Sequence, residues 1–193
     1  MSTATAEVGL DLSMVQPADI ILTTSPTTTS RSIRAGTCGS YSHAILSLYD
    51  GRCIQAMPGA GVDDLPLNEA LEDATYATLY RHKFMDVESA GLVCSIALEQ
   101  RPKKYDKIGA ARSGVSSGCG GVLRGTKAGF MVELLHDAAH NGKHAEKFFC
   151  SELIAYAFEQ ADMRLLDLPF HAVSPRAIAT SKKLILVKDL IIA

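Results

Sequence analysis

The sequence contains no tryptophan, and only 6% of its residues are aromatic. It also lacks an excess of basic residues, since 19 Lys and Arg stand against 21 Asp and Glu and give a formal net charge of −2 at pH 7. Binding to nucleic acid or to an anionic membrane usually requires a concentrated basic face. No uninterrupted apolar run approaches the roughly 18–20 residues that cross a bilayer. We therefore expect no nucleic-acid partner and no transmembrane segment.

The N-terminal ten residues contain no Lys or Arg and no sustained apolar core, so they do not resemble a secretory signal. The protein is expected to be made as a cytoplasmic chain, and its later export as an effector is an option that no feature of the sequence supports. The 5 cysteines form no Cys-x-x-Cys pair, and an odd number cannot all be bridged within one chain. A reducing compartment is the simpler assumption.

A chain of 193 residues, 47% of them hydrophobic, is long enough for one domain with a sizeable core. Residues 1–16 are small and polar, and we expect a disordered N-terminal extension there. A single domain is then expected to occupy residues 17–193, with its first strand after Pro17.

The first half of the chain has the pattern of short antiparallel strands. Five segments have a β-branched or apolar strand composition, at residues 19–24, 42–49, 52–57, 62–66 and 77–82. Asp50-Gly51 joins the second to the third, and an Asp-Gly pair between two apolar runs is a strong hairpin signal. The Ser/Thr-rich residues between the first two segments indicate a loop or a short helix.

The second half has a helical period. Apolar residues recur every three or four positions from Val87 to Leu98, and a further helix is expected to open at Tyr105. The expected order then continues with a glycine-rich surface loop at 114–129, helices at about 128–140 and from Cys150, a capped helix after Ser174, and a strand at 184–187. Strands followed by helices and one late strand predict an α+β fold.

Cys150 is the leading candidate for a nucleophile because it lies at the expected first turn of an apolar helix, Cys150–Phe158. Free N–H groups and the positive end of the helix dipole favour a thiolate at such a position. The alternative is a small apolar residue that packs beneath the helix, where most free cysteines are found. Cys53 and Cys94 are expected to be buried.

A thiolate nucleophile needs a base, and the base needs a group that orients its ring. His43 begins one strand of the expected hairpin, and Gln55 lies on the partner strand, so the two side chains lie close together if the register agrees. Tyr41 and Ser42 are next to the base and are candidates for lining a substrate cleft, although a structural role is the preferred interpretation for both.

His136 and His140 are a competing candidate for a metal site, because they lie four residues apart on an expected helix. Asp137 stands where zinc peptidases use Glu, and Asn141-Gly142 should end the helix before His144. The default interpretation is therefore an exposed polar helix end. The glycine cluster lacks the Lys-Ser ending of a phosphate loop, so a nucleotide site is not expected there. Together these observations lead us to expect no metal and no cofactor.

Six short motifs occur in an order that resembles the YiiX-like permuted papain-fold family, which is grouped with the NlpC-type cell-wall peptidases and the lecithin retinol acyltransferase group. They are Ala18–Leu22, Tyr41–Leu46, Cys53–Val62, Tyr105-Asp106, Phe149–Leu153 and Ser174-Pro175. The resemblance covers roughly residues 17–188. It implies a circularly permuted papain-like fold, in which an antiparallel strand meander (a partial barrel) packs against helices and the cysteine lies at a helix N-terminus.

Carried onto this sequence, the resemblance implies Cys150 as nucleophile and His43 as base. Gln55 matches the third position, where the family often has a carboxylate. The implied activity is a cysteine hydrolase that cleaves a peptide or N-acyl amide bond through a thioester. A lipid acyl hydrolase or acyltransferase and a catalytically silent binding module are the alternatives. The substrate is expected to be a small acylated, peptide or lipid molecule, and the oligomeric state stays open.

Overall fold

A six-stranded antiparallel sheet organises the computed structural model, which describes residues 12–37, 39–106, 109–110 and 147–190. Its order is β4-β3-β2-β1-β5-β8. The strands are β1 (Ile20–Thr24), β2 (His43–Ser47), β3 (Arg52–Met57), β4 (Gly61–Pro66), β5 (Tyr76–His82) and β8 (Leu184–Leu190). The α+β class and the antiparallel arrangement expected from the sequence are confirmed.

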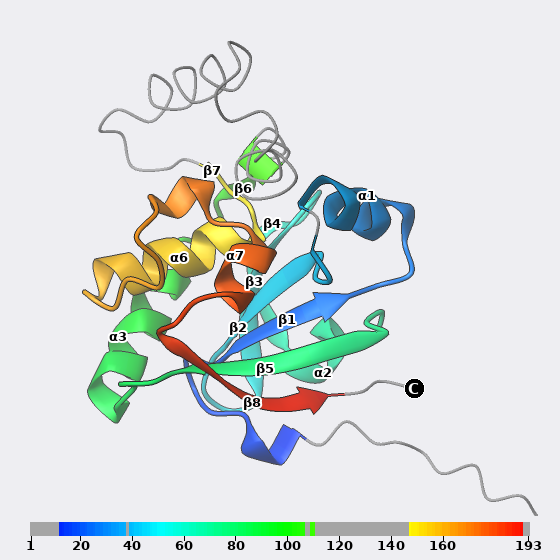
Figure 1. Cartoon of the computed structure of the whole chain (residues 1–193). Helices are drawn as coiled ribbons and strands as arrows, with labels where there is room; N and C mark the ends of the chain where they lie inside the picture. Colours follow the sequence, from blue (N-terminus) through cyan, green and yellow to red (C-terminus); the bar gives the residue numbers. More distant parts are fainter. Residues whose placement is uncertain (1–11, 38, 107–108, 111–146, 191–193) are drawn as a thin grey trace, which may run out of the picture.

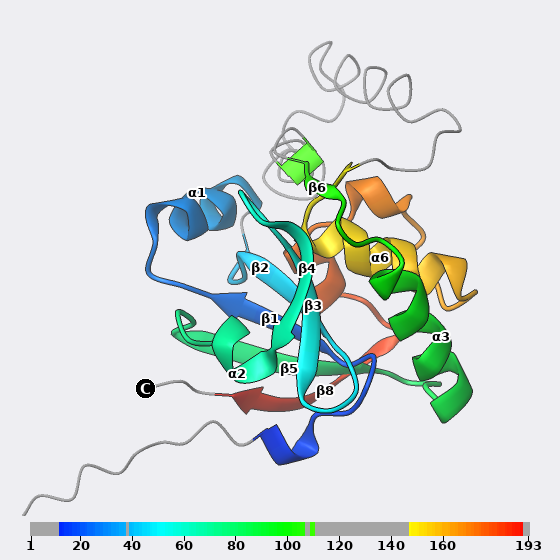
Figure 2. The same ribbon diagram turned by 180° about the vertical axis from the view of Figure 1, so that it is seen from behind.

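Helices cover both faces of this sheet. The helical elements are η1 (Leu12–Met14), α1 (Thr28–Thr37), α2 (Leu67–Ala70), α3 (Val87–Leu98), α6 (Cys150–Gln160), η3 (Phe170–Ala172) and α7 (Pro175–Ala179). Figure 1 shows α3, α6 and α7 on one side, and Figure 2 shows α2 on the other. A short parallel pair, β6 (Lys104–Tyr105) with β7 (Lys147–Phe148), lies at the start of α6. None of the described helices is long and apolar enough to cross a bilayer.

Alternation along the central strands produces two cores. Ile20 and Leu46 belong to the larger apolar cluster, beneath α3 and α6, whereas Ile21 and Ile45 belong to a smaller one with α2. Successive strand residues point to opposite faces, so a strand buried on both sides must be apolar at every position. The segments Ile20–Leu22 of β1 and Ala44–Leu46 of β2 meet this requirement, and all six residues are fully buried.

The β2–β3 hairpin predicted from Asp50-Gly51 is confirmed. Asp50 and Gly51 have φ values of 56° and 68°, the left-handed conformation at both central positions that a tight hairpin turn requires. The strands pair Ser47 with Cys53 and Leu46 with Ile54. The capped helix predicted after Ser174 is also present, because the Ser174 side chain accepts from the N–H of Ala177.

Two expectations differ from the structure. Tyr105 lies in strand β6 rather than at the start of a helix, because Lys104 and Tyr105 pair with Lys147 and Phe148. The ordered fold begins before residue 17, because Leu12 and Val15 pack against the smaller core. The expectations for residues 1–11, the helix at 128–140 and the glycine-rich loop concern residues outside the described part of the chain.

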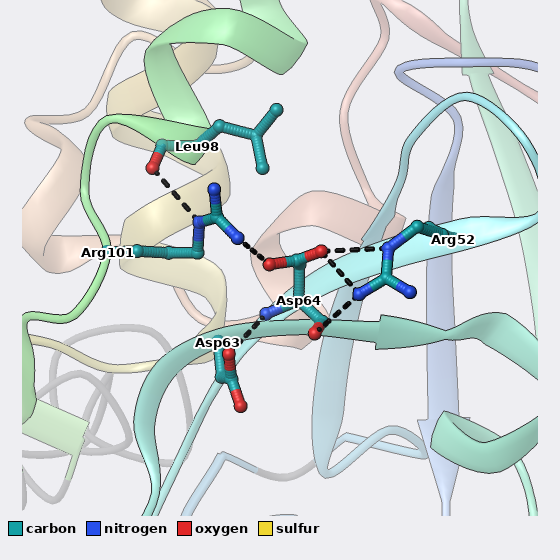
Figure 3. Close-up of polar contacts among 5 residues, drawn as sticks. All are labelled: Arg52, Asp63, Asp64, Leu98 and Arg101. Atoms are coloured by element: carbon teal, nitrogen blue, oxygen red, sulfur yellow. Dashed lines mark hydrogen bonds and ion pairs between the residues drawn. The ribbon is translucent and has the colours of Figure 1, made fainter.

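A carboxylate on β4 joins this edge of the sheet to the end of α3. Figure 3 shows Asp64 between Arg52 and Arg101, with the Arg52 Nε atom 2.8 Å from Asp64 Oδ2. Arg101 also donates to the carbonyl of Leu98, the last residue of α3. Exposed ion pairs contribute little singly, but a shared carboxylate fixes the direction in which the chain leaves α3 towards β6.

The same connection is held to β4 by the backbone. The N–H of Val62 donates to the carbonyl oxygen of Lys103 over 2.8 Å. Gly61 has a φ of +83°, and a Cβ atom there would overlap the Lys103 carbonyl oxygen. Gly59 also has a positive φ, of +95°, but no atom lies within 4 Å of its would-be Cβ.

Gly61→Ala is therefore expected to destabilise the protein more than Gly59→Ala. Both replacements carry the backbone strain of a positive φ, roughly 1–2 kcal/mol. Gly61→Ala adds a clash with Lys103, and we expect a further loss of about 1–3 kcal/mol. Urea unfolding of the two variants measures the difference, and equal midpoints would contradict the close approach of β4 to Lys103.

Candidate functional site

Cys150 is the first residue of α6, and its side chain lies at the interface between that helix and the sheet. Phe149 is the N-cap, with extended backbone angles of φ −101° and ψ 170°. Leu153, Ile154 and Phe158 are fully buried, so packing of the helix presses its first turn towards β2 and β3. Cys150 keeps 6% exposure. The structure thus places this residue at the helix start expected from the sequence.

His43 and Gln55 come together on the hairpin. Continuing the β2–β3 register places Gln55 beside Ile45, and His43 is two residues from Ile45 on the same strand face. The Nε2 atom of His43 lies 2.6 Å from Oε1 of Gln55. An amide oxygen accepts but cannot donate, so Nε2 carries the proton of this bond.

Electrostatic coupling joins Cys150 to His43. Burial opposes the thiolate, but the positive charge of His43, its side-chain hydrogen bond and the N–H groups of Ala44 and Ser151 outweigh it, so the pKa of Cys150 lies below its ordinary value. Burial also opposes a charged His43, yet the negative Cys150 and the bond to Gln55 raise the pKa of His43. The arrangement favours a thiolate beside an imidazolium.

A cavity of about 480 Å³ opens from this pair towards α1 and α2. Its size is within the range that holds a small-molecule ligand, about 300–1,000 Å³. Hydroxyl groups and apolar side chains make up most of its lining, and the carboxylates of Glu69 and Asp73 lie on the α2 side. The hydroxyl groups are those of Thr23, Ser25, Thr27, Ser30, Ser42 and Tyr105, and the apolar side chains are those of Ile33, Met57, Pro58, Leu65, Ala70 and Ala74. No Lys or Arg is among the described residues that line it.

Tyr105 is a residue of the site to which the sequence reasoning assigned no role. It lines the cavity together with Cys150. Burial, followed by the negative charges of Cys150, Asp106 and Glu152, raises the pKa of Tyr105, so its hydroxyl keeps its proton and is available as a donor. The Tyr105-Asp106 motif was a signal in the sequence, but a two-residue strand has no periodicity from which its position could be predicted.

Of the two residues proposed to line the cleft, one lines the cavity and the other contacts β5. Ser42 does line it, and its hydroxyl accepts from Ser30 of α1 over 2.7 Å. Tyr41 is not among the described lining residues. Its hydroxyl donates to Thr78 over 2.9 Å, and its ring stacks on Tyr76 at a centroid distance of 6.2 Å, so Tyr41 packs against β5.

Comparison with known proteins identifies the fold. No family model matches the sequence, and no curated protein matches it. The crystal structure of the metalloprotein YiiX from Escherichia coli O157:H7 superposes with a TM-score of 0.61 at 18% sequence identity, over 90% of this chain and 96% of that one. The chain therefore has a YiiX-like α+β fold, with an antiparallel sheet packed against helices.

A resident metal does not fit the described part of this chain. There, no group of three or more His, Cys, Asp or Glu side chains is placed to hold a metal ion. The thiol and imidazole of the site interact with each other, and two ligands alone are fewer than a structural or catalytic zinc site has. His136, His140 and His144, weighed above as possible metal ligands, lie outside the described residues.

Selective alkylation tests the charge state of Cys150. At neutral pH, iodoacetamide is expected to label Cys150 and to leave Cys53 and Cys94 unlabelled, because burial raises the pKa of those two thiols to about 12 and about 11. His43→Ala should slow the labelling of Cys150 roughly tenfold or more, since the charge that lowers its pKa is removed. Peptide mass mapping measures each site, and unchanged labelling in the variant would exclude the thiolate–imidazolium pair.

Proposed function

We propose that the protein is a cysteine hydrolase that cleaves an amide bond, in a peptide or an N-acyl compound, through a thioester on Cys150. The observation that carries the proposal is the coupled pair of Cys150 and His43 at one end of a ligand-sized cavity. Buried structural cysteines such as Cys53 and Cys94 have raised pKa values, whereas that of Cys150 is lowered. Opposite shifts within one protein support a chemical role for Cys150.

Acylation begins with attack of the Cys150 thiolate on the carbonyl carbon. The C–S bond forms as the carbonyl π electrons move to oxygen, and the resulting oxyanion needs donors that are already in place. The N–H of Cys150 is one of the first in α6 and has no acceptor within the helix. The Tyr105 hydroxyl is the second donor that we assign.

His43 serves both halves of the reaction. Because Nε2 is bonded to Gln55, Nδ1 is the ring nitrogen left for Cys150 and the leaving group. The imidazolium protonates the departing amine as the C–N bond breaks, which leaves a thioester and a neutral ring. That ring then takes a proton from water, whose oxygen attacks the thioester carbonyl; the C–S bond breaks, which releases the acid and returns the Cys150 thiolate beside the imidazolium. Gln55 orients the ring but cannot stabilise the imidazolium by charge as Glu would.

The proposal includes a circularly permuted papain-like core of the NlpC type. Its support is the chain order, because the His43 strand precedes the Cys150 helix, together with the six motifs described above. A silent binding module would have no need for the mutual pKa shifts of Cys150 and His43, so these shifts argue against that alternative.

A lipid acyl hydrolase on the same fold is the second candidate. Ile33, Met57, Pro58 and Leu65 give the cavity an apolar lining that suits an acyl chain. Glu69 and Asp73 lie on its wall without a Lys or Arg among the described lining residues, so an anionic headgroup would be repelled. Neutral or cationic amides fit this lining better than phospholipids do.

Hydrolysis of a panel of peptides, N-acyl amides and O-acyl esters tests the activity. Cys150→Ala and His43→Ala are each expected to lower kcat/KM about 10³-fold or more. For the wild type, kcat/KM should fall in acid as the thiolate is protonated below its lowered pKa, and fall in base as His43 loses its proton above its raised pKa.

An acyl-enzyme trapped on Cys150 and identified by mass would report the acyl group directly. Cleavage of esters of fatty acids but of no amide would move the assignment to the lipid hydrolase. A wild-type protein that hydrolyses none of the panel and forms no adduct with it, while Cys150 still alkylates selectively, would argue against the hydrolase.

Tyr105→Phe tests the second oxyanion donor. Loss of the hydroxyl is expected to lower kcat about 10²-fold with little change in KM, because the bond forms only to the developing oxyanion. Tyr49→Phe is the matched control, since Tyr49 is 46% exposed and outside the cavity lining. Equal kinetics for the two variants would remove Tyr105 from the mechanism.

A further inference from the structure

Glu152 is a carboxyl group sealed inside the first turn of the helix that carries Cys150. Its side chain has 0% exposure. The Oε2 atom accepts from the backbone N–H of Phe149 over 3.2 Å, which is the glutamate half of a capping box. The Oε1 atom is buried and has no hydrogen-bond partner among the described residues. Phe149 has no side-chain acceptor, so Glu152 is the group that caps this end of α6.

No cation compensates this carboxyl within the described part of the chain. The described ion pairs involve Asp64, Asp19 and Glu159 as their acidic partners, and Glu152 is in none of them. The titratable groups that act on it are Asp106 and Cys150, and Glu152 in turn acts on Tyr105. All three can only become neutral or negative. Burying an unpaired carboxylate among them is unfavourable, whereas a neutral acid needs no counter-ion.

The electrostatics agree with this geometry. Burial, followed by the negative charges of Asp106 and Cys150 and opposed by the N–H of Phe149, raises the pKa of Glu152 to about 8. At neutral pH the group is therefore mostly protonated. An ordinary glutamate at the same position would place a negative charge two residues from the nucleophile.

We infer that Glu152 is a positioning residue for Cys150: an uncharged carboxylic acid that caps α6 through Phe149 and leaves the positive end of the helix to the thiolate. The inference rests on the proposed function only for what the thiolate does. The charge of Glu152 itself can be measured without a substrate. A neutral cap holds the backbone around Cys150, and it adds no charge that competes for the same N–H dipoles.

The two groups must also influence each other reciprocally. If ionised Cys150 makes it harder for Glu152 to lose its proton, then removing the charge of Cys150 makes this easier by the same free energy. A merely structural glutamate that is buried but does not sense the nucleophile would show no such dependence. Coupling therefore separates a positioning role from simple burial.

Carboxyl ¹³C NMR of the full-length protein, titrated with pH, tests the inference. In the wild type, the Glu152 carboxyl is expected to titrate near pH 8, well above the other carboxyls. In Cys150→Ser, which keeps the size of the side chain and removes its charge, the midpoint should fall measurably. A Glu152 midpoint near the ordinary value of 4.5 would overturn the neutral acid. A raised midpoint that Cys150→Ser leaves in place would overturn the coupling.

Rescue by a conservative variant gives a second readout. Glu152→Ala removes the cap and is expected to slow alkylation of Cys150 at neutral pH about tenfold. Glu152→Gln keeps an acceptor for Phe149 without a charge and should recover most of that loss. A glutamine variant as slow as the alanine variant would mean that the negative charge is required, contrary to the inference.

Glu159→Gln is the matched control, because Glu159 lies on the same helix but pairs with Arg164 at its far end. None of these measurements needs turnover. If the protein hydrolyses none of the panel but Glu152 titrates at a raised midpoint that Cys150→Ser lowers, the hydrolase proposal fails and this inference stands. If the protein is a hydrolase but Glu152 titrates at its ordinary value, this inference fails and the hydrolase proposal stands.

Discussion

The packing of α6 against β2 and β3 is the contact on which the site depends. Fully buried residues such as Ile154 and Phe158 pack the helix against the sheet, and that packing determines where its first residue lies. His43 and Gln55 come from one hairpin, whereas Cys150 comes from the opposite structural layer. The pair exists because an apolar interface brings the two layers together, with no covalent or metal link between them among the described residues.

Charge within this interface is balanced against burial. Desolvation alone would keep Cys150 as a thiol and His43 as a neutral ring, as it does for Cys53, whose pKa burial raises to about 12. Mutual attraction reverses the outcome at Cys150 because the two groups lie close together where water does not screen them. Glu152 meets the same burial with no cationic partner among the described residues, and the rise of its pKa to about 8 favours the protonated form instead. Cys150 and Glu152, in the same turn of α6, thus favour opposite states: the thiol tends to lose its proton and the carboxyl tends to keep its own.

Sequence patterns predicted the local parts of this site and could not predict how they meet. Asp50-Gly51 identified the hairpin because left-handed turns have few suitable residues, and the apolar run after Cys150 identified the start of α6. The position of Tyr105 was missed because its strand exists only through pairing with β7, more than 40 residues away. The His43–Gln55 contact depended on a register that local composition does not encode. The cavity walls combine α1, α2 and β3, so no single segment reveals them.

The division of the site between two layers makes the lowered pKa of Cys150 depend on folding. Before α6 docks on the hairpin, Cys150 has neither His43 nor the N–H of Ala44 beside it, and its thiol has the weak reactivity of an ordinary cysteine. A newly made or damaged chain would therefore resist the oxidation and stray acylation to which a permanent thiolate is prone. The pKa of Cys150 is lowered only once the chain has folded.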